Sequence, residues 1–280
     1  MVKFLRRLLP AFVLFTLTIC EGGSVRREMR WVVCYSDKPR VEEFAGYDLV
    51  VLDSDAHPSL TALTRHGSVL AYLSVGEVAN HRGYFAAVKA EGILLGENPT
   101  WRGSFFVDVR DPRWQQRVIG QLVPAVLASG FSGIFLDTLD DPVALERANP
   151  ERYHGMTAAA ASLVKTLRQA FPQIRLMVNR AYELMPEIAR LIDYLAGESV
   201  YTTYNAAHRG YIRVMAAQYR EQLALMRQAL RWNPKLRLCS LDYWDPNDRK
   251  EIRHIYQVER ANGFAPYVAT PELDRIVRAP

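Results

Sequence analysis

The feature that most constrains the fold is a series of short apolar runs that alternate with longer amphipathic stretches. A run that is apolar throughout is typical of a strand buried on both faces of a parallel sheet. Eight strand–helix repeats in roughly 250 residues are typical of a closed (β/α)8 barrel. The sequence therefore predicts the α/β class and a single-domain (β/α)8 TIM-type barrel, with an open doubly wound sheet as the alternative. The eight runs lie at residues 31–35, 49–53, 69–77, 133–137, 174–179, 194–199, 236–243 and 265–270.

One further strand-like run, at residues 104–109, falls in the long stretch after the third barrel strand. We expect it to form an additional short strand inserted there. Apolar residues at helical spacing predict helices over residues 156–171 and 211–232. A capping residue directly before a proline predicts three further helix starts. These pairs are Asp111-Pro112, Asp245-Pro246 and Thr270-Pro271.

The N-terminus has the layout of a secretory signal peptide. A basic start is followed by an apolar run over residues 8–19, too short to span a bilayer comfortably, and then by the sequence EGGS. We predict a signal peptide over residues 1–23 and a mature domain over residues 24–280. The mature protein is expected to be secreted or periplasmic, with no stable membrane span. Lipid attachment at Cys20 is a weaker alternative, because Ile19 stands where a small residue is expected.

The charge balance does not indicate a nucleic-acid partner. The formal net charge is +5, but Lys and Arg are scattered through the predicted helices beside Asp and Glu. We therefore expect a solvated basic surface. No Gly-rich turn follows the first strand, where CYSDKPR stands instead, which argues against a nucleotide cofactor.

Neither a metal nor a reactive thiol is indicated by the positions of histidine and cysteine. All six histidines fall in predicted helices or loops, so a zinc centre is not expected, although an oxygen-ligated Ca²⁺ or Mg²⁺ stays open. We predict no cofactor and no metal site. Cys34 and Cys239 each lie within a strand-like run and are interpreted as buried thiols, unless their strands are neighbours and a disulfide joins them.

Acidic, amide and aromatic residues gather at the ends of the predicted strands and in the loops that follow. In a barrel these carboxyl ends form the catalytic face. Carboxylates accept hydrogen bonds from hydroxyl groups, and aromatic rings cover the apolar side of a sugar. The pattern therefore predicts a carbohydrate cleft. Its candidate residues are Tyr35, Asp53, Glu77, Asp137, Asp140, Asn179, Glu198, Tyr204, Asp242 and Tyr243.

Two of these acids have the placement that glycoside hydrolysis needs. Asp137 ends the fourth strand and Glu198 the sixth, and alternate barrel strands direct side chains into the same layer. A pair of carboxylates can then converge on one glycosidic bond. Asp140 is interpreted as a neighbour that helps to keep one carboxyl protonated by like-charge repulsion. Asp141 before Pro142 is interpreted as ordinary helix or turn initiation, and capping is likewise an alternative role for Asp53.

Six motifs resemble glycoside hydrolase family 114, the endo-α-1,4-polygalactosaminidases, a family that includes the hydrolase domain of the Pel polysaccharide system. The resemblance implies a (β/α)8 barrel that cuts α-1,4-linked galactosamine or N-acetylgalactosamine polymers, with Asp137 and Glu198 as the catalytic pair. It also implies that Glu77, Asn179 and Asp242 line the cleft. The motifs are AYLSVGE (71–77), FFVDVRDPRW (105–114), GIFLDTLD (133–140), VNRAYEL (178–184), GESVYTTYN (197–205) and SLDYWD (240–245).

We therefore expect an exported, monomeric, retaining glycosidase that acts on a galactosamine-containing biofilm exopolysaccharide. Asp137 is expected to attack the anomeric carbon, and Glu198 to act as general acid and then as general base. Residues 141–154, the least family-like stretch, are expected to form a loop over the cleft. A non-catalytic polysaccharide-binding barrel is the alternative, and a barrel hydrolase or lyase that uses a divalent ion is a weaker one.

Overall fold

Eight parallel strands form the central sheet of the structure, a computed structural model that describes residues 28–65 and 67–280. Their order is β1-β2-β3-β7-β8-β9-β12-β13, and each neighbouring pair is parallel. Each of the eight predicted runs contributes one strand to this sheet. The strands are β1 (Trp31–Cys34), β2 (Leu49–Asp53), β3 (Ser68–Ser74), β7 (Gly133–Asp137), β8 (Arg175–Asn179), β9 (Tyr194–Glu198), β12 (Arg237–Tyr243) and β13 (Ala265–Ala269).

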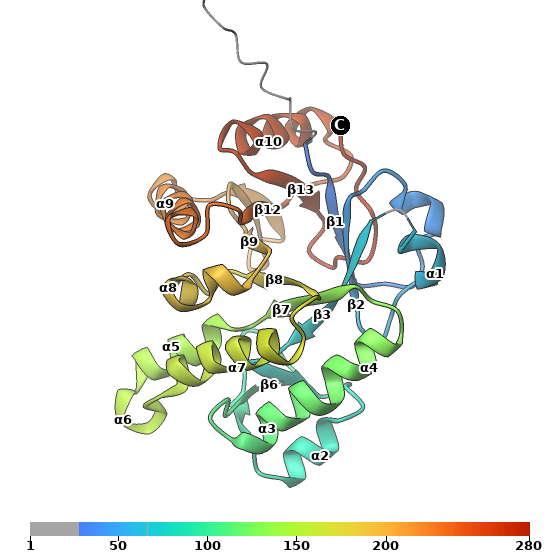
Figure 1. Cartoon of the computed structure of the whole chain (residues 1–280). Helices are drawn as coiled ribbons and strands as arrows, with labels where there is room; N and C mark the ends of the chain where they lie inside the picture. The colour runs from blue at the N-terminus through green and yellow to red at the C-terminus, as the bar shows by residue number, and fades with distance from the viewer. Residues whose placement is uncertain (1–27, 66) are drawn as a thin grey trace, which may run out of the picture.

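The first and last strands lie side by side, so the sheet curves into a nearly closed barrel (Figure 1). The Trp31 indole Nε1 donates to the Ala265 carbonyl oxygen at 2.9 Å across this seam. The prediction of a (β/α)8 barrel is therefore confirmed, and the open doubly wound alternative is not the fold.

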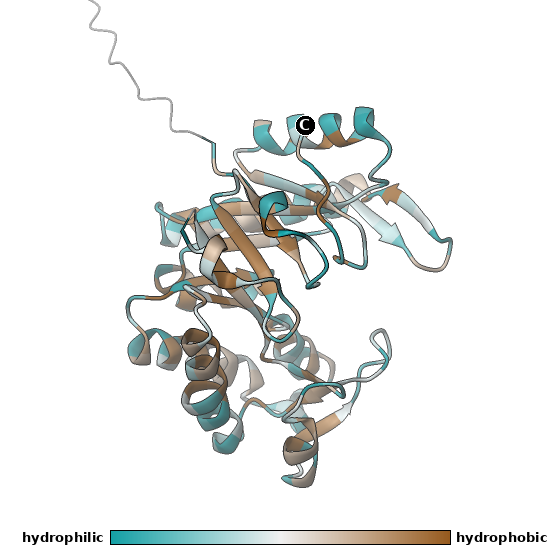
Figure 2. Cartoon of the chain, turned by 90° about the vertical axis from the view of Figure 1, so that its right-hand side faces the viewer, coloured by the Kyte–Doolittle hydropathy of each residue, from teal (hydrophilic) through white to brown (hydrophobic). Residues whose placement is uncertain are grey.

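The strands are buried on both faces, as their apolar composition predicts. Every residue of β1, β2 and β13 is buried, and Figure 2 shows the hydrophobic residues concentrated in the strands and on the helix faces that cover them. At the start of β7 only glycine fits, because a Cβ atom on Gly133 would overlap the backbone of Arg175 in the adjacent strand. The core thus lies inside the barrel and between the barrel and its helices.

A small antiparallel sheet is inserted between β3 and β7. It consists of β4 (Glu77–Ala79), β6 (Ser104–Val107) and β5 (Leu94–Glu97), in that order. The prediction that the additional strand belongs to an insertion is confirmed, although the strand ends at Val107. The predicted third barrel strand, in contrast, ends at Ser74, and Glu77 belongs to the inserted sheet.

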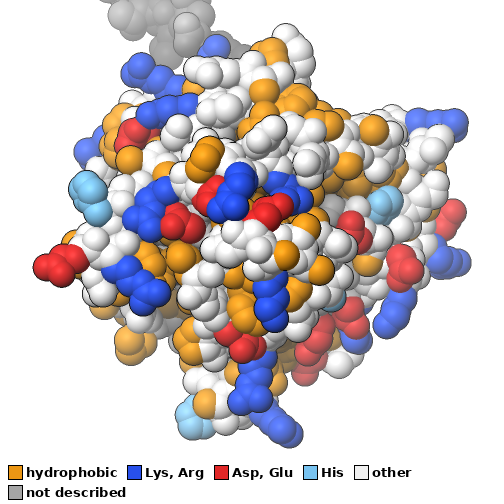
Figure 3. Space-filling model, turned by 90° about the horizontal axis from the view of Figure 1, so that it is seen from below, with side chains coloured by type: hydrophobic (Ala, Val, Ile, Leu, Met, Phe, Trp, Pro, Cys, Tyr) orange, Lys and Arg blue, Asp and Glu red, His pale blue; other side chains and the backbone are white. Residues whose placement is uncertain are grey.

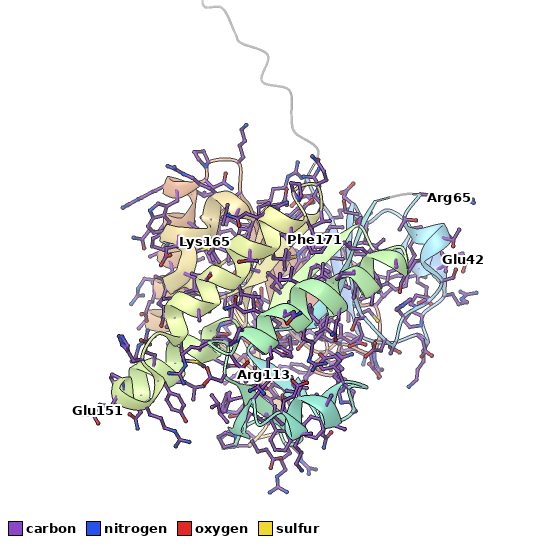
Figure 4. All side chains as sticks on the ribbon, turned by 60° about the horizontal axis from the view of Figure 1, so that its bottom comes forward. Glu42, Arg65, Arg113, Glu151, Lys165 and Phe171 are labelled. Atoms are coloured by element: carbon purple, nitrogen blue, oxygen red, sulfur yellow. The ribbon has the colours of Figure 1, made fainter. Side chains whose placement is uncertain are left out.

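Helices cover the outside of the barrel, and Figure 4 looks onto α3, α4 and α7, with Arg113 labelled on α3 and Lys165 on α7. The helix predicted over residues 156–171 is α7. The α-helices are α1 (Leu60–Leu63), α2 (Phe85–Ala90), α3 (Pro112–Arg117), α4 (Val123–Ala128), α5 (Asp140–Ala148), α6 (Pro150–Tyr153), α7 (Met156–Ala170), α8 (Met185–Ile188), α9 (Ala216–Trp232) and α10 (Arg249–Ala261). Short turns of other helix types are η1 (Val41–Phe44), η2 (Val118–Leu122), η3 (Tyr182–Leu184) and η4 (Ala189–Leu191).

Only one of the three predicted capping positions starts a helix. Asp111 caps α3, where its carboxylate accepts a 2.9 Å hydrogen bond from the Arg113 backbone N–H. The prediction at Asp245 is wrong, because its carboxylate instead closes a turn by accepting from the Asn247 N–H, and α10 begins later. The prediction at Thr270 is also wrong, since a turn and not a helix follows it.

Two further segments differ from the prediction. Residues 141–154, expected to form a loop over the cleft, are largely helical and form most of α5 and all of α6. The helix predicted from residue 211 begins at Ala216, because the residues before it form a β-hairpin of β10 (Thr202–Asn205) and β11 (Gly210–Arg213). Residues 211–213 therefore belong to a strand and residues 214–215 to the connection before α9, and none of them to a helix.

Cys34 and Cys239 are both buried and free. They do not form a disulfide, because β13 lies between their strands β1 and β12 in the barrel. On the face shown in Figure 3, basic and acidic side chains are interspersed. Within residues 28–65 and 67–280 no helix is long and apolar enough to cross a membrane. The predicted signal peptide, including Cys20, lies outside the described residues.

Candidate active site

Three polar side chains meet at the carboxyl ends of three adjacent barrel strands. Asp137 ends β7, Asn179 ends β8 and Glu198 ends β9. The Asn179 side-chain amide Nδ2 donates to Asp137 Oδ1 at 2.9 Å and to Glu198 Oε2 at 2.7 Å. One amide group therefore bridges the two carboxylates that the sequence pairs.

Each of these three residues is followed by a residue with left-handed backbone. The φ angles are 62° at Thr138, 54° at Arg180 and 52° at Ser199. This conformation costs a residue with a Cβ atom roughly 1–2 kcal/mol, so the surrounding contacts must hold it. Thr138 Oγ1 accepts from the Gly76 N–H at 2.8 Å, and the Ser199 N–H donates to the Leu241 carbonyl at 2.8 Å. The chain thus turns sharply after each strand, at the barrel mouth.

Tyrosine hydroxyl groups approach the two carboxylates from other strands. The Tyr243 hydroxyl donates to Glu198 Oε1 at 2.6 Å. On the other side, Tyr72 of β3 forms a hydrogen bond with Asp137, and its ring packs against Tyr35 with the centroids 4.6 Å apart. Burial raises the pKa of all three phenols well above the usual value, so they stay protonated and can donate.

Gln222 of α9 holds the strand end that carries Glu198. Its side-chain Nε2 donates to the Glu198 carbonyl oxygen at 3.0 Å and to the Tyr182 hydroxyl at 2.9 Å. Sequence reasoning missed both Gln222 and Tyr72. Tyr72 lies in the middle of a strand, and the signal for it is the two-residue alternation that places it on the same face as Ser74 at the strand end. No comparable pattern marks Gln222.

Burial and a neighbouring negative charge disfavour the ionised form of Asp137. Burial, followed by the charge of Glu198, raises the pKa of Asp137 to about 6, although the hydrogen bond from Asn179 opposes this shift. Burial also raises the pKa of Asp140, despite Arg180, whose Nε lies 3.7 Å from the carboxylate. The Asp137 carboxyl is therefore protonated more readily than an exposed aspartate.

A cavity of about 520 Å³ opens beside Glu198, between α5, η3 and α9. Five of its lining side chains are acidic and two are basic, so its walls carry excess negative charge. The acids are Asp140, Asp141, Glu183, Glu198 and Glu221, and the bases are Arg147 and Arg180. In the part of the chain that the structure describes, no group of three or more His, Cys, Asp or Glu side chains is arranged to hold a metal ion.

A family model for glycoside-hydrolase family GH114 matches residues 21–280. The chain belongs to family GH114. It is accordingly a glycosidase. Barrel enzymes carry their catalytic residues at the carboxyl ends of the strands, the end of this barrel at which Asp137 and Glu198 lie.

Three relatives place this GH114 chain among known proteins. An uncharacterised protein of Deinococcus radiodurans is 30% identical over 82% of this chain and 75% of its own length. The glycoside hydrolase domain of PelA from Pseudomonas aeruginosa is 26% identical, with a TM-score of 0.78 that covers 89% of this chain and 97% of that one. Ega3 from Aspergillus fumigatus, solved in complex with galactosamine, is 15% identical with a TM-score of 0.66 over 89% and 94% of the two chains, and shares the fold.

Asp53 supports a loop of the GH114 barrel and is not free for a ligand. Its carboxylate accepts from the backbone N–H groups of Asp55 and Ala56 and from the guanidinium of Arg82, with the shorter contact at 2.6 Å. Burial opposes ionisation, but hydrogen bonding by Arg82 holds the pKa of Asp53 below its usual value. Arg82 also lies 5.9 Å from the centroid of the Tyr72 ring. The loop after β2 is thereby tied to the wall beside Asp137.

Glu77 does not line the cleft as expected, because it belongs to the inserted sheet. Its side chain is buried and accepts hydrogen bonds from Asn98 and Ser104. Asp141, interpreted from the sequence as helix initiation only, lines the cavity and pairs with Glu77. Burial, followed by Glu77, raises the pKa of Asp141 to about 9, so its carboxyl is neutral at pH 7. The pair joins the inserted sheet to the first turn of α5.

Asp242 and Tyr204 also lie elsewhere than the cleft prediction placed them. Asp242 is 0% exposed and lies beside Glu259 of α10. Strand alternation explains this position. Tyr243, the next residue, contacts Glu198, and successive side chains of a strand point to opposite faces. Tyr204 lies on the hairpin, where it pairs with Tyr211 at a ring-centroid distance of 5.2 Å, and it is not among the residues that line the cavity.

Proposed function

We propose that this GH114 chain hydrolyses α-1,4-linked galactosamine-containing polysaccharide by a retaining mechanism, with Asp137 as nucleophile and Glu198 as general acid and base. The observation that carries the proposal is the Asn179 amide that bonds both carboxylates. The two bonded oxygens can be no further apart than these two hydrogen bonds laid end to end. That limit is close to the roughly 5–5.5 Å of retaining glycosidases and below the roughly 6.5 Å at which inverting spacings begin.

The residues around the pair support one proton transfer in each step. Asp137 attacks the anomeric carbon while Glu198 gives its proton to the departing glycosidic oxygen, which forms a glycosyl ester on Asp137. Glu198 then removes a proton from water, which attacks the same carbon and releases Asp137. Asn179 donates to both carboxylates throughout, and Tyr243 orients Glu198.

Because the pKa of Asp137 is raised, the bound substrate must help to keep this carboxyl ionised. Below pH about 6 the Asp137 carboxyl holds a proton in the free protein, whereas a nucleophile must be ionised. The ammonium group of a galactosamine unit beside Asp137 would favour the ionised form of that carboxyl. Binding of a cationic sugar would therefore help to keep Asp137 ionised, as a nucleophile must be.

The substrate class rests on the family and on charge. The PelA hydrolase domain supports a polysaccharide hydrolase, and the acidic cavity suits cationic, partly deacetylated amino sugars. We propose Tyr35 and Asp140 as substrate-binding residues, because Tyr35 contacts the tyrosine beside Asp137 and Asp140 lines the cavity. Neither Asp242 nor Glu77 is retained in that role.

Export completes the proposal. The predicted signal peptide over residues 1–23 would deliver the domain of residues 24–280 to the periplasm or the medium as a monomer. The test is N-terminal sequencing of the protein recovered from the producing cells, together with its mass in solution. A chain that keeps residues 1–23 in the cytoplasm would contradict export.

The function is tested with defined α-1,4-linked galactosamine oligomers, free and N-acetylated. We expect shorter oligomers by mass spectrometry and, at early times, an α-anomeric product by NMR. Asp137→Asn and Glu198→Gln should abolish hydrolysis while oligomer binding, measured by calorimetry, persists. The absence of any product from all α-linked hexosamine oligomers would overturn the proposed substrate, and an initial β-anomer would overturn retention.

A further inference from the structure

A second pair of carboxyl groups lies buried behind the barrel wall. Asp242 of β12 and Glu259 of α10 are each 0% exposed. Asp242 Oδ2 and both carboxyl oxygens of Glu259 have no hydrogen-bond partner of standard geometry. Burying carboxyl groups with so little compensation is costly, so the pair requires an explanation that the proposed reaction does not supply.

Asp242 is attached to the segment that follows Glu198. Its Oδ1 accepts hydrogen bonds from the backbone N–H groups of Tyr201 at 2.7 Å and Thr202 at 2.8 Å. These residues come directly after the turn that begins at Ser199, whose left-handed backbone redirects the chain at the end of β9. The carboxylate therefore fixes the far end of the turn that carries Glu198.

Asp242 also determines the position of Tyr243, which contacts Glu198 directly. Tyr243 follows Asp242 in β12 and donates its hydroxyl to Glu198 Oε1 at 2.6 Å. The Ser199 N–H bonds the carbonyl of Leu241, the residue before Asp242. Three consecutive residues of β12, Leu241 to Tyr243, thus contact either the Glu198 side chain or the turn that follows it.

The charges around the pair favour a single shared proton. Burial raises the pKa of Asp242, and burial followed by the charge of Asp242 raises the pKa of Glu259. Two adjacent buried carboxyls cannot both be ionised, so Glu259 is the neutral partner near pH 7. The groups that face the pair are Tyr219 and Arg227 of α9, Asn262 after α10, Ser240 of β12, and Tyr201 and Thr202 at the hairpin.

We propose that Asp242, supported from behind by a neutral Glu259, is a positioning residue that holds Glu198 in its working geometry. The inference rests on the proposed function, in which Glu198 is the general acid and base. Asp242 touches no reacting atom. It acts through the Tyr201–Thr202 backbone and through the placement of Tyr243.

The test makes the same substitution at two aspartates whose carboxylates accept backbone hydrogen bonds near the two ends of strand β9. Asp242→Leu removes the acceptor beyond the carboxyl end of β9 but keeps the bulk. Asp193→Leu is the matched control, because Asp193 precedes β9 at its other end and accepts from the Leu176 N–H at 3.0 Å and from Arg168 at 3.0 Å. The kcat, KM and melting temperature of both variants are measured on the galactosamine oligomers.

Both leucine variants are expected to lower the melting temperature, but only Asp242→Leu should lower kcat, by about tenfold or more with KM changed far less, since small misplacements cost rate. Asp242→Asn, whose side-chain oxygen still accepts from both N–H groups, should recover kcat to within about threefold of the wild type. A kcat for Asp242→Leu equal to that of Asp193→Leu, per folded molecule, would overturn the inference.

A pH measurement keeps the inference testable if Asp242→Leu does not fold. Ionisation of Glu259 above pH about 8 places a second charge beside Asp242. In the wild type, kcat should then fall above that pH, and in Glu259→Gln, which cannot ionise, that fall should disappear. An identical alkaline profile in the two proteins would overturn the inference.

The two proposals fail in different ways. If Glu198→Gln keeps the wild-type kcat, the proposed function itself is wrong. If Glu198→Gln is inactive while Asp242→Leu keeps the wild-type kcat and Glu259→Gln keeps the wild-type pH profile, only the positioning role is wrong.

Discussion

The Tyr243 hydroxyl donates a 2.6 Å hydrogen bond to Glu198 Oε1, so the side chain that ends β9 is held from the neighbouring strand β12. Asn179 bonds the other carboxylate oxygen from β8. With one donor on each oxygen, Glu198 has a fixed orientation before any substrate arrives. Such preorganisation is what proton transfer in a barrel enzyme requires.

Removing the Tyr243 hydroxyl should slow the reaction without unfolding the protein. A hydrogen bond to a charged group contributes about 1.5–3 kcal/mol, so Tyr243→Phe should lower kcat roughly 10- to 100-fold. The rate on galactosamine oligomers measures this change. Tyr211→Phe, on the hairpin, is the control and should keep the wild-type rate. Equal rates for the wild type and Tyr243→Phe would contradict the orienting role.

Removing the bridging amide should change the pH dependence of activity as well as the rate. The Asn179 hydrogen bond stabilises the ionised form of Asp137 and so lowers its pKa against burial. In Asn179→Ala that pKa should rise above about 6, and the acidic limb of the kcat/KM profile should move to higher pH. A limb that stays in place, or moves to lower pH, would show that Asn179 does not act on Asp137.

The turn after Asp137 should not tolerate a side chain at position 76. A Cβ atom on Gly76 would overlap the Thr138 carbonyl oxygen, whereas one on Gly96 would meet nothing within 4 Å. Gly76→Ala should therefore destabilise the protein by about 1–3 kcal/mol, the usual cost of overpacking, and Gly96→Ala by less than about 0.5 kcal/mol. Urea unfolding measures both. Similar unfolding midpoints for the two variants would refute the close approach.

The Glu77–Asp141 pair should make stability depend on alkaline pH. The pKa of Asp141 is raised in the folded protein from 3.8 to about 9, so the folded state holds a proton that the unfolded chain releases. This stabilising contribution is complete below pH 3.8 and is lost as the pH rises through about 9. The melting temperature of the wild type should fall over that range more steeply than that of Asp141→Asn, which carries no such proton. Parallel melting curves across pH would count against the pair.

The barrel was predictable because its signal is repeated eight times. Each strand reads as an apolar run, and a strand end such as Asp137 or Glu198 follows directly from where the run stops. The helix starts at Asp245 and Thr270 failed because a capping residue before proline also begins turns, and only the chain beyond it decides between them. Residues 211–213 were predicted as helical because their apolar residues continue the spacing of α9, although they form strand β11.

The direction of a side chain at a strand end was harder to predict than the end itself. Asp242 and Tyr243 are neighbours in β12, and a shift of one residue decides which of them faces Glu198 and which faces α10. Glu77 was misplaced because the chain leaves the barrel after Ser74 and enters the inserted sheet. Both errors concern register over one to three residues, which apolar patterning does not resolve.

The inserted sheet also bears on how quickly the barrel forms. It separates β3 from β7, so that Val69 and Ser132, which bond across this pair of strands, lie 63 residues apart, whereas Arg30 and Asp48 beside β1 and β2 lie 18 apart. Closing the longer loop costs roughly 1 kcal/mol more entropy. The pairing of β3 with β7 is therefore expected to form late in folding. Lengthening the insertion further should slow the pairing of the strand that carries Asp137 with β3.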